Sequence, residues 1–446
     1  MPTHDLLNLP GFEVVSVQDS EHDYHIDAIS TVPVEACPHC QYRQVDGFGR
    51  REQMVRDLPI HGKRVGIYIK TRRFRCKACQ KTFYEALPGV NAKRSMTDRL
   101  VAWIGHQAVK RTFVSIAEEV GCVEGTVRLI FKDYIAALSE KIRFETPKWI
   151  GIDEIHLIRP RGVIANIQNN TIVELLHNRN KDTMVHYLSH LEGRDQVQYV
   201  AMDMWKPYRD AVEAVLPQAR IIIDKFHVLR MANNAMEGIR KGYRETLTSK
   251  QRRGLLHDRF VLLKREKDLS DQESLTLSGW IQNYPELGQA YRLKEQFFGI
   301  YDAQTKADAL QRYTAWEKSV GPDVREAYAD LIRAWSNWQP YILNYFDHPV
   351  TNAYTESLNN LIRVMNRLGR GYSFEALRAK ILFAEGAFKK QNIRPKFERR
   401  RSDEIGADAI GMIGYGTFNQ QPTQSKEVNY GPDISTLVRM IEEGIL

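Results

Sequence analysis

Two cysteine pairs restrict the fold of the N-terminal part of this chain more than any other feature of its sequence. The segments CPHC (37–40) and CKAC (76–79) each contain two cysteines separated by two residues. A pair with this spacing at a turn can direct two thiolates at one ion, and two pairs complete the four-sulfur tetrahedral shell that structural zinc prefers. Because four sulfur ligands leave no open coordination position, we expect Cys37, Cys40, Cys76 and Cys79 to hold a structural Zn²⁺ ion and not a catalytic one.

Disulfide bonds are the main alternative for these cysteines. The first residues, MPTHDLLNLPGFEVV, contain no basic and apolar segments typical of an export signal, and no apolar run approaches the roughly 20 residues that span a bilayer. We therefore expect a cytoplasmic protein without membrane contact, in which disulfides are disfavoured. The segment VGIYIKTRRFRC (65–76) alternates apolar and basic residues and predicts short strands, so residues 37–91 indicate a zinc ribbon with an inserted hairpin.

The net charge of +8 hides two strongly basic segments. Residues 1–40 contain seven acids and no Lys or Arg, whereas residues 41–110 contain 16 bases against 5 acids, a net charge of +11. Residues 359–401 contain 12 bases against 3 acids, a net charge of +9. Two such segments predict two contacts with a polyanion such as DNA, and a solvated basic surface that binds nothing is the alternative. The candidates for contacting phosphates in the first segment surround Phe74: Arg72, Arg73, Arg75 and Lys77.

A second module follows at residues 92–146. Apolar residues at helical spacing predict a helix over 95–110, and two further apolar stripes lie on either side of Gly121 in TFVSIAEEVGCVEGTVRLIFKDYI (112–135). Two short helices joined by a glycine turn predict a helix-turn-helix, although a helical hairpin within a bundle would look similar. The second helix would present Thr126, Arg128 and Lys132, together with Glu124, to the DNA major groove.

From residue 148 the chain alternates strands and helices. The pattern predicts strands in KWIGIDEIHLI (148–158), GVIANIQ (162–168), NTIVELLHNR (170–179), QVQYVAMDMW (196–205) and ARIIIDKFHV (219–228), and helices in DTMVHYLSHLEG (182–193) and KPYRDAVEAVL (206–216). Three adjoining strands followed by alternating helices and strands indicate a mixed α/β sheet of the ribonuclease H type.

Two acids lie among apolar neighbours on these strands. Asp153 is in the first strand and Asp203 ends the fourth, where a carboxylate is costly to bury unless a cation compensates it. Consecutive strand residues face opposite sides, so Glu154 competes with Asp153, and the strand pattern does not choose between them.

A third acid, Glu356, begins the helix predicted in TNAYTESLNNLIRVMNRLGRG (351–371). Helical spacing places Leu358, Leu361, Ile362, Met365 and Leu368 on the buried side and Asn352, Glu356, Asn359, Asn360, Arg363 and Arg367 on a polar face. A glutamate in a first helical turn often serves only the helix dipole. Here it shares a face with Arg363 and Arg367, which are candidates for binding phosphates. Three convergent carboxylates are typical of phosphoryl transfer with two Mg²⁺ or Mn²⁺ ions, because hard cations prefer oxygen ligands.

The order of these motifs resembles a known family. The chain resembles the DDE transposases of bacterial insertion sequences of the ISL-three family. The motifs that carry the resemblance are, in order, CPHC, CKAC, the helix-turn-helix, GIDE, AMDMWKPY, DKFH and TNAYTESLNNLIR. The resemblance covers roughly residues 37–400 and implies a retroviral-integrase-like fold. It places the three catalytic, metal-binding acids on Asp153, Asp203 and Glu356, and so favours Asp153 over Glu154. Asp224 and His227 in DKFH correspond to an accessory motif of related transposases.

The interval of 153 residues from Asp203 to Glu356 is long for such a core and implies an insertion. Helical patterns dominate it, and we expect Trp280, Trp316, Trp335 and Trp338 to lie mostly in its core. The expected organisation has six parts: an acidic N-terminal segment (1–36), the zinc ribbon (37–91), the helix-turn-helix (92–146), a split catalytic domain (147–230 and 351–400), an all-helical insertion (231–350) and a C-terminal tail (401–446).

The resemblance implies a transposase that binds the terminal inverted repeats of a mobile element in double-stranded DNA, cuts them and joins them to a target. It also implies a homo-oligomer on DNA and association with the nucleoid. Two alternatives remain: a nuclease or resolvase of the same fold that never joins DNA, and a DNA-binding regulator whose catalytic domain has lapsed.

Overall fold

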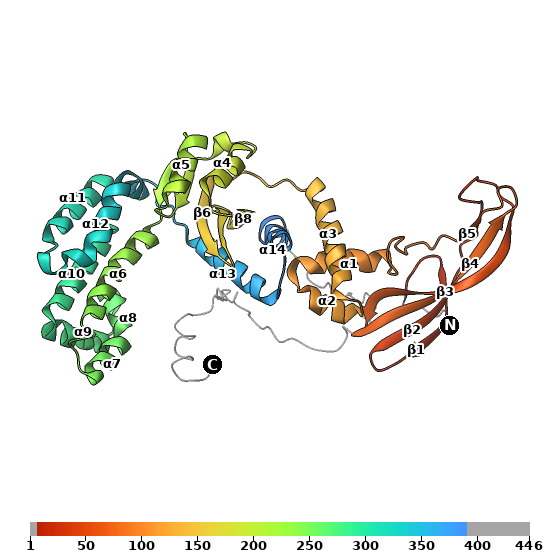
Figure 1. The fold of residues 1–446 in the computed structure, drawn as a ribbon, viewed down its shortest axis with the longest axis horizontal. Helices are drawn as coiled ribbons and strands as arrows, with labels where there is room; N and C mark the ends of the chain where they lie inside the picture. The colour runs from red at the N-terminus through yellow and green to blue at the C-terminus, as the bar shows by residue number, and fades with distance from the viewer. Residues whose placement is uncertain (1–6, 390–446) are drawn as a thin grey trace, which may run out of the picture. The chain divides into compact units, whose positions relative to one another are not determined.

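The computed structural model describes residues 7–389, in which two five-stranded sheets and several groups of helices follow one another along the chain (Figure 1). The C-terminal tail predicted for residues 401–446 and the last part of the second basic segment lie outside the described residues. Among those described, no helix has both the length and the apolar composition to cross a membrane.

The first sheet contains the strands β1 (Phe12–Asp19), β2 (Asp23–Ser30), β3 (Val45–Ile60), β4 (Lys63–Cys76) and β5 (Thr82–Tyr84). Its order is β1-β2-β4-β3, with β5 also paired to β4. The hairpin between the cysteine pairs differs from the short strands expected, because β3 and β4 have 16 and 14 residues. Buried Val55, Val65, Ile67 and Ile69 form an apolar face in the half of the hairpin nearer its turn, whereas the first half of β3 is mostly exposed.

The acidic residues before the first cysteine belong to the same sheet and not to a separate segment ending at residue 36. Strand β2 pairs in parallel with β4, and Asp23 accepts two hydrogen bonds from Arg64, of 2.6 and 2.8 Å. Lys63 pairs with Asp19 in the same way. Part of the basic excess of residues 41–110 is therefore neutralised by the acids of β1 and β2, which pairing across strands brings beside it.

Three helices form the next module: α1 (Asp98–Lys110), α2 (Phe113–Val120) and α3 (Glu124–Lys141). Gly121 ends α2 with φ = 70°, a left-handed conformation that favours glycine, and a three-residue turn leads into α3. The predicted stripes of α2 and α3 pack together through Ile116, Val120 and Val127. The three helices have the arrangement expected of a helix-turn-helix.

The second sheet contains β6 (Trp149–His156), β7 (Pro160–Asn166), β8 (Thr171–Leu175), β9 (Tyr199–Met202) and β10 (Arg220–Ile223) in the order β10-β9-β6-β7-β8. Strand β6 is antiparallel to β7 and parallel to β9, so the sheet is mixed as predicted. The helices α4 (Lys181–Ser189) and α5 (Lys206–Val215) contribute to the core on one of its faces. The fifth strand is shorter than predicted: it ends at Ile223, and Asp224 begins a helix instead.

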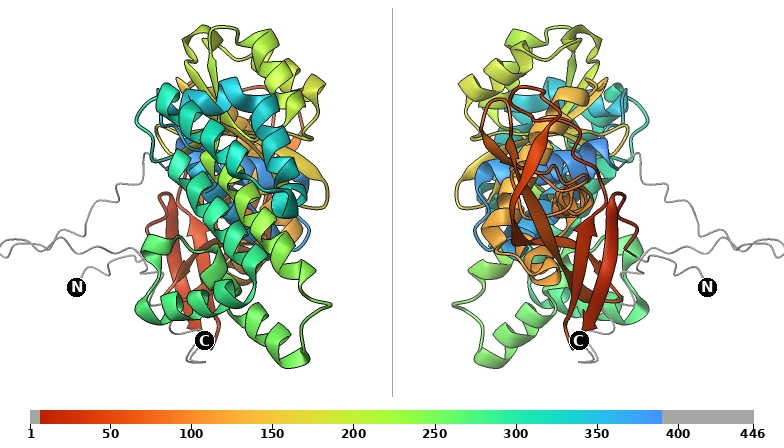
Figure 2. Two further views of the ribbon diagram at one scale, coloured as in Figure 1. Left: turned by 90° about the vertical axis from the view of Figure 1, so that its left-hand side faces the viewer. Right: turned by 90° about the vertical axis from the view of Figure 1, so that its right-hand side faces the viewer.

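Between β10 and residue 346 all regular structure is helical. The helices are α6 (Lys225–Gly242), α7 (Ser249–His257), α8 (Arg259–Leu263), α9 (Asp271–Asn283), α10 (Pro285–Ile300), α11 (Lys306–Ser319) and α12 (Pro322–Leu343), with short 3₁₀ turns at Glu266–Asp268 and Asn344–Phe346. Among them, α6, α10, α11 and α12 lie side by side (Figure 2). Trp316, Trp335 and Trp338 are buried as expected, whereas Trp280 is only partly buried. The apolar core continues without a break into the second sheet.

Two helices cover the other face of that sheet: α13 (Ala353–Leu368) and α14 (Phe374–Ile381), which continues as a π-helical turn (Leu382–Ala387). The Lys380 side chain of α14 is buried, and its ammonium group donates a hydrogen bond of 2.8 Å to the carbonyl oxygen of Arg111. Phe383 and Ala384 also join the core of the helix-turn-helix. Lys380, counted above as part of a DNA-binding segment, is thus a structural residue.

Candidate active site and zinc centre

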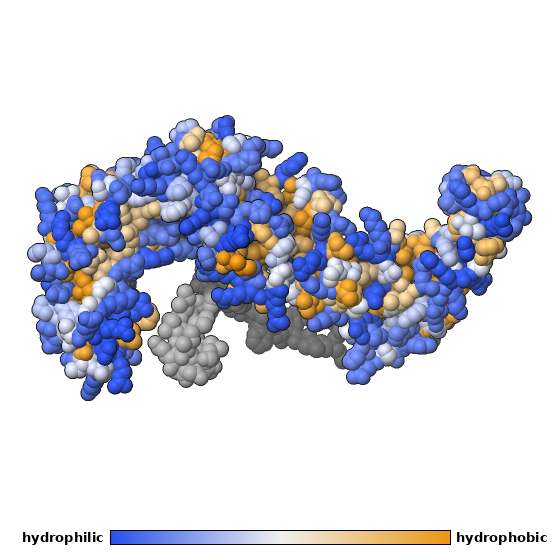
Figure 3. All heavy atoms as spheres, in the orientation of Figure 1, coloured by the Kyte–Doolittle hydropathy of each residue, from blue (hydrophilic) through white to orange (hydrophobic). Residues whose placement is uncertain are grey.

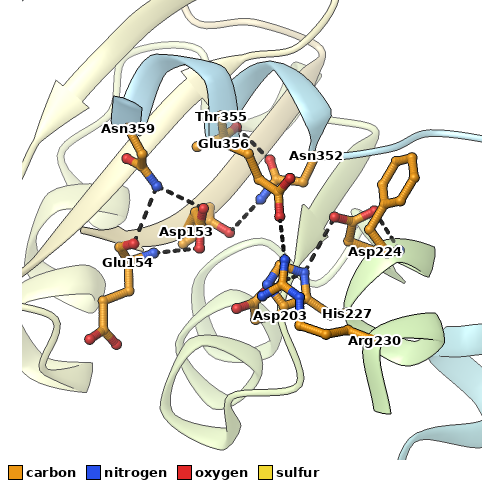
Figure 4. A network of polar contacts seen from close by, with 12 residues as sticks. Asp153, Glu154, Asp203, Asp224, His227, Arg230, Asn352, Thr355, Glu356 and Asn359 are labelled. Atoms are coloured by element: carbon orange, nitrogen blue, oxygen red, sulfur yellow. Dashed lines mark hydrogen bonds and ion pairs between the residues drawn. The ribbon is translucent and has the colours of Figure 1, made fainter. Parts of the chain in front are cut away.

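Asp153 projects from β6 toward α13, and its side chain is 6% exposed (Figure 4). One carboxylate oxygen accepts a hydrogen bond of 2.7 Å from the backbone N–H of Glu154, and the other accepts one of 2.8 Å from the side-chain amide of Asn359. Asn359 lies 206 residues away in sequence, on α13. The helix therefore fixes the orientation of this carboxylate.

Asp203 follows β9, the strand that pairs in parallel with β6, and so lies beside Asp153. Its Oδ1 is 2.7 Å from Nδ1 of His227, and the same Nδ1 is 3.3 Å from Oδ2 of Asp224. Asp224 is fully buried and is the N-cap of α6, which places His227 in the first turn. The imidazole of His227 thus connects Asp224 of the DKFH motif with Asp203.

Glu356 lies in the first turn of α13, and its carboxylate accepts a hydrogen bond of 3.0 Å from Arg230 of α6. Ligand atoms of Asp153, Asp203 and His227 lie within 4.8 Å of one another, as do those of Asp224, His227 and Glu356. His227 is common to the two groups, and all three predicted acids line one cleft of about 470 Å³.

The charges in this cleft perturb each other strongly. Burial, together with the nearby charge of Asp203, raises the pKa of Asp153 to about 7. Burial alone would lower the pKa of His227, but its ion pairs with Asp203 and Asp224 raise it to about 10. The imidazole is therefore protonated at neutral pH, and His227 and Arg230 act as counterions of Asp203 and Glu356.

Helix α13 approaches β6 closely at Gly151, two residues before Asp153. The Asn352 amide donates a hydrogen bond of 3.1 Å to the carbonyl oxygen of Ile152. A Cβ atom on Gly151 would collide with Oδ1 of Asn352 and lie only 2.5 Å from Oγ1 of Thr355. The glycine of GIDE is thus required for contact between the strand that carries Asp153 and the helix that carries Glu356.

We expect Gly151→Ala to destabilise the protein by about 1 to 3 kcal/mol, the usual cost of overpacking a filled site. The melting temperature should fall by several degrees, and DNA cleavage should fall with it because α13 is displaced. Gly238→Ala in α6 is the matched control, since nothing lies within 4 Å of its added methyl group. Equal melting temperatures for the two variants would contradict the close contact.

Glu154 faces away from α13, as the alternation along β6 requires. Its carboxylate pairs with Arg179, whose guanidinium stacks over Trp205 at 4.6 Å. Both Asp153 and Glu154 line the cleft, but only Asp153 lies in a group with Asp203.

The four predicted zinc ligands converge at the end of the first sheet. Their sulfur atoms lie within 4.8 Å of one another, with 3.7 Å between Cys37 and Cys79 and 3.5 Å between Cys40 and Cys76. A tetrahedron with zinc–sulfur distances of about 2.3 Å has edges of about 3.8 Å, so the cluster fits one zinc ion. Backbone N–H groups of Cys79 and Ala78 lower the pKa of the Cys76 thiol to about 7, which favours a thiolate at Cys76. Burial and hydrogen bonds with the other three cysteines raise the pKa of Cys40 to about 11, so the first thiolate of the cluster is expected at Cys76.

The basic residues predicted to bind DNA on β4 and directly after it have protein partners of different strength. Arg72 donates to the buried carboxylate of Glu85 at 2.7 and 2.9 Å and is held in place. The guanidiniums of Arg73 and Arg75 lie over the exposed ring of Phe48, at 5.4 and 5.8 Å. Lys77 is 3.2 Å from Asp46 at the surface. Arg73 and Arg75 are therefore better placed than Arg72 to reach a phosphate.

The predicted contacts on α3 and α13 are also unequal. Thr126 is partly exposed and Lys132 is exposed on α3, while Arg128 donates to Glu124 at 2.6 Å. On α13, Arg363 lines the cleft and donates to Asn360 at 2.9 Å, and Arg367 is exposed.

The helical pattern misassigned part of α13. Leu368, placed on the buried side, is 61% exposed, whereas Asn352 and Asn359, placed on the polar face, are buried. The reason is that this polar face packs on β6, where backbone and carboxylate groups satisfy the amides. Arg230 was missed, although its position three residues after His227 places both on one face of a helix.

Comparisons with known families agree with this architecture. A model of the DDE transposases of family ISL3, described as "Transposase", matches residues 150–381, more than half of the chain. The model "zinc-finger of transposase IS204/IS1001/IS1096/IS1165" matches residues 33–79, and "Helix-turn-helix domain of transposase family ISL3" matches residues 85–135.

Individual relatives are distant but extensive. The chain is 23% identical over 350 residues to the transposase for insertion sequence element IS1001 of Bordetella parapertussis, a match that covers 77% of this chain and 86% of the relative. It is 24% identical over 306 residues to the transposase for IS1557 of two Mycobacterium tuberculosis strains, CDC 1551 / Oshkosh and H37Rv, covering 62% of this chain and 68% of the relative. With one family model spanning the second sheet and α13, and two more covering the modules before it, the chain belongs to the ISL3 (ISL-three) family of transposases.

Proposed function

We propose that this transposase cuts the inverted-repeat ends of its mobile element and joins them to target DNA by metal-dependent phosphoryl transfer at Asp153, Asp203 and Glu356. The observation that carries the proposal is their convergence on one cleft, although Glu356 lies 153 residues beyond Asp203. Water attacks the phosphodiester first, and the freed 3′-hydroxyl is then the nucleophile for joining at the same site.

The proposed fold of the catalytic part is ribonuclease H-like, of the retroviral-integrase type. The strand order β10-β9-β6-β7-β8, with β6 at its centre, supports it. In this proposal residues 147–230 and 351–400 form the core and the helices of 231–350 are an insertion. The helix α6 crosses from one to the other, since it begins at Lys225 beside the cleft and ends at Gly242.

The donor atoms suit hard divalent cations such as Mg²⁺ or Mn²⁺. Carboxylate oxygens dominate the cleft, and Oδ1 of Asn359 is buried there with no hydrogen-bond partner among the described residues. Asp153, Asp203 and Glu356 would hold the ions. Bound there, two cations would favour formation of the attacking hydroxide and stabilise the leaving oxygen.

The remaining residues position these groups and the DNA. Asn359 orients Asp153, and buried Asp224 holds the imidazole of His227 against Asp203. Arg230 and Arg363 line the cleft as cations that can neutralise a bound phosphate. The residues that would contact DNA outside the cleft are Arg73, Arg75, Lys77, Thr126, Arg128, Lys132 and Arg367. Arg72 is held by Glu85 and would support the strand that carries Arg73 and Arg75.

The zinc ion would fold the ribbon that carries Arg73 and Arg75, and the helix-turn-helix would bind the inverted repeat. Because the two ends of an element must meet before joining, we also propose a homo-oligomer on DNA.

The deciding experiment incubates the full chain with duplexes that carry the element's ends, a target plasmid and Mg²⁺. We expect both cleaved ends and covalent end–target products. Cleaved ends without joined products would indicate the nuclease or resolvase, and binding without cleavage would indicate the regulator.

A further inference from the structure

A third basic region lies outside the two that charge alone identified. Residues 240–267 contain ten bases against three acids, a net charge of +7. They extend from the end of α6 through α7 and α8. Figure 3 shows a mostly hydrophilic surface where these helices lie.

Several of these bases already have carboxylate partners. Arg240 and Arg259 pair with Glu237, Lys264 pairs with Glu273, and Arg265 pairs with Asp302. Six others are exposed and have no carboxylate within 4.0 Å among residues 7–389: Lys267 and, near the start of α7, Lys241, Arg244, Lys250, Arg252 and Arg253. The last five are here called the α7 tip. Charges left unpaired in this number repel each other unless a polyanion binds.

The groove beside the α7 tip contains no acidic side chain, although Glu245 is exposed next to Arg244. A groove of about 440 Å³ between α7 and α9 is lined by Gln251, Thr276, Gly279, Trp280, Asn283 and Tyr284, none of which is acidic. Amide and aromatic side chains can contact the sugar–phosphate backbone of DNA.

We propose that the α7 tip binds the backbone of the same DNA duplex whose phosphate occupies the cleft. Helix α6 is unbroken and carries His227 and Arg230 at one end and Lys241 at the other. From His227 to Lys241 it rises by about 21 Å at 1.5 Å per residue. A duplex running along α6 from the cleft reaches Lys241, where the tip begins, after about six base pairs, given 3.4 Å per base pair.

A second copy of the chain is a weaker occupant for this surface. Leu256 and Phe260 are 59% and 70% exposed nearby, which would suit a protein contact. A twofold interface, however, presents the same patch on both copies and would bring the two sets of five unpaired bases together. Bound DNA would neutralise the repulsion among the unpaired bases, whereas a second copy of the chain would increase it.

The inference rests on the proposed function, because it uses the cleft as the place where DNA is cut. Its test measures DNA binding by the full chain as a function of NaCl concentration, with a 40-base-pair duplex that carries one end of the element. The variant is Lys250→Gln with Arg252→Gln and Arg253→Gln. The control is Lys318→Gln with Arg325→Gln and Arg333→Gln, in a stretch (317–333) with three bases against four acids.

Each phosphate contact contributes about 0.9 to the slope of log affinity against log salt. We expect the slope of the variant to fall by about 2 to 3 and that of the control to stay within about 0.5 of wild type. Hydroxyl-radical footprints should lose protection only at positions about six base pairs or more from the cleaved bond.

If the variant has the same salt slope and the same footprint as the wild-type protein, the inference is overturned. This holds whether or not the wild-type protein cleaves the DNA. A change of oligomeric mass with no change of slope would also overturn it and assign the tip to contacts between copies. Failure of wild type to cleave would instead contradict the proposed function, and the slopes would still decide about the tip.

Discussion

Replacing Asp203 with asparagine should reduce the rate of DNA cleavage by at least about a thousandfold, which corresponds to about 4 kcal/mol of activation free energy. The amide keeps the shape of the side chain but removes a negative charge from the group formed by Asp153, Asp203 and His227. It also removes the ion pair with His227, whose Nδ1 lies 2.7 Å from the carboxylate oxygen, although the amide oxygen can still accept a hydrogen bond. Both losses weaken the binding of divalent cations between the acids.

The measurement is single-turnover cleavage of end DNA with Mg²⁺, together with a gel-shift titration that should show unchanged DNA affinity. Asp195→Asn is the matched control, because Asp195 is exposed on a 3₁₀ turn away from the cleft residues. Glu154→Gln should lose far less activity than Asp203→Asn, since Glu154 pairs with Arg179. Normal cleavage by Asp203→Asn, with intact binding, would exclude the proposed acid triad.

Replacing Cys76 with serine should remove zinc from the protein and abolish specific binding of the inverted repeat. Structural zinc sites contribute about 10 to 16 kcal/mol of binding free energy, which is folding free energy for the segment that they close. Cys76 is fully buried beside Cys37 and ends β4, the strand that carries Arg73 and Arg75. Loss of the ion should therefore disorder the strand end on which those arginines lie.

Elemental analysis should give about one zinc per chain for wild type and close to none for Cys76→Ser. Gel-shift titration should show loss of preference for the element's end over unrelated DNA. Cys122→Ser is the control, because Cys122 is the one cysteine outside the four-sulfur cluster in residues 7–389. Full zinc content in Cys76→Ser would show that Cys76 is not a ligand.

Local sequence patterns predicted the strands and helices whose apolar spacing is set by residues close together in the sequence. Alternating apolar residues located β6, β7 and β8, and helical spacing located α1 and α2, within a few residues of the observed ends, whereas α3 continues to Lys141, beyond the predicted segment. The pattern failed at Asp224, which reads as the end of a strand but is the N-cap of α6. Where a helix begins directly after a strand, as at Asp224, the periodicity of apolar residues alone does not show where the strand ends.

Long-range contacts explain what the pattern missed in the candidate site. Asn359 reads as a surface residue until β6 lies beside it, and Arg230 has no evident role until Glu356, 126 residues later, faces it. Likewise, the acids of β2 look like a separate segment until parallel pairing brings them to the bases of β4.

By itself, the sequence predicted the four cysteines as zinc ligands, the helix-turn-helix, and Asp203 and Glu356 as candidate acids, because spacing within a turn, a helix or a strand depends only on neighbouring residues. Only the tertiary structure decided which side of β6 faces α13, and hence that Asp153 and not Glu154 lies with Asp203. It also decided which bases are neutralised and which, like those of the α7 tip, remain unpaired among the described residues. Charge pairing depends on distance in space, and no local pattern contains that distance.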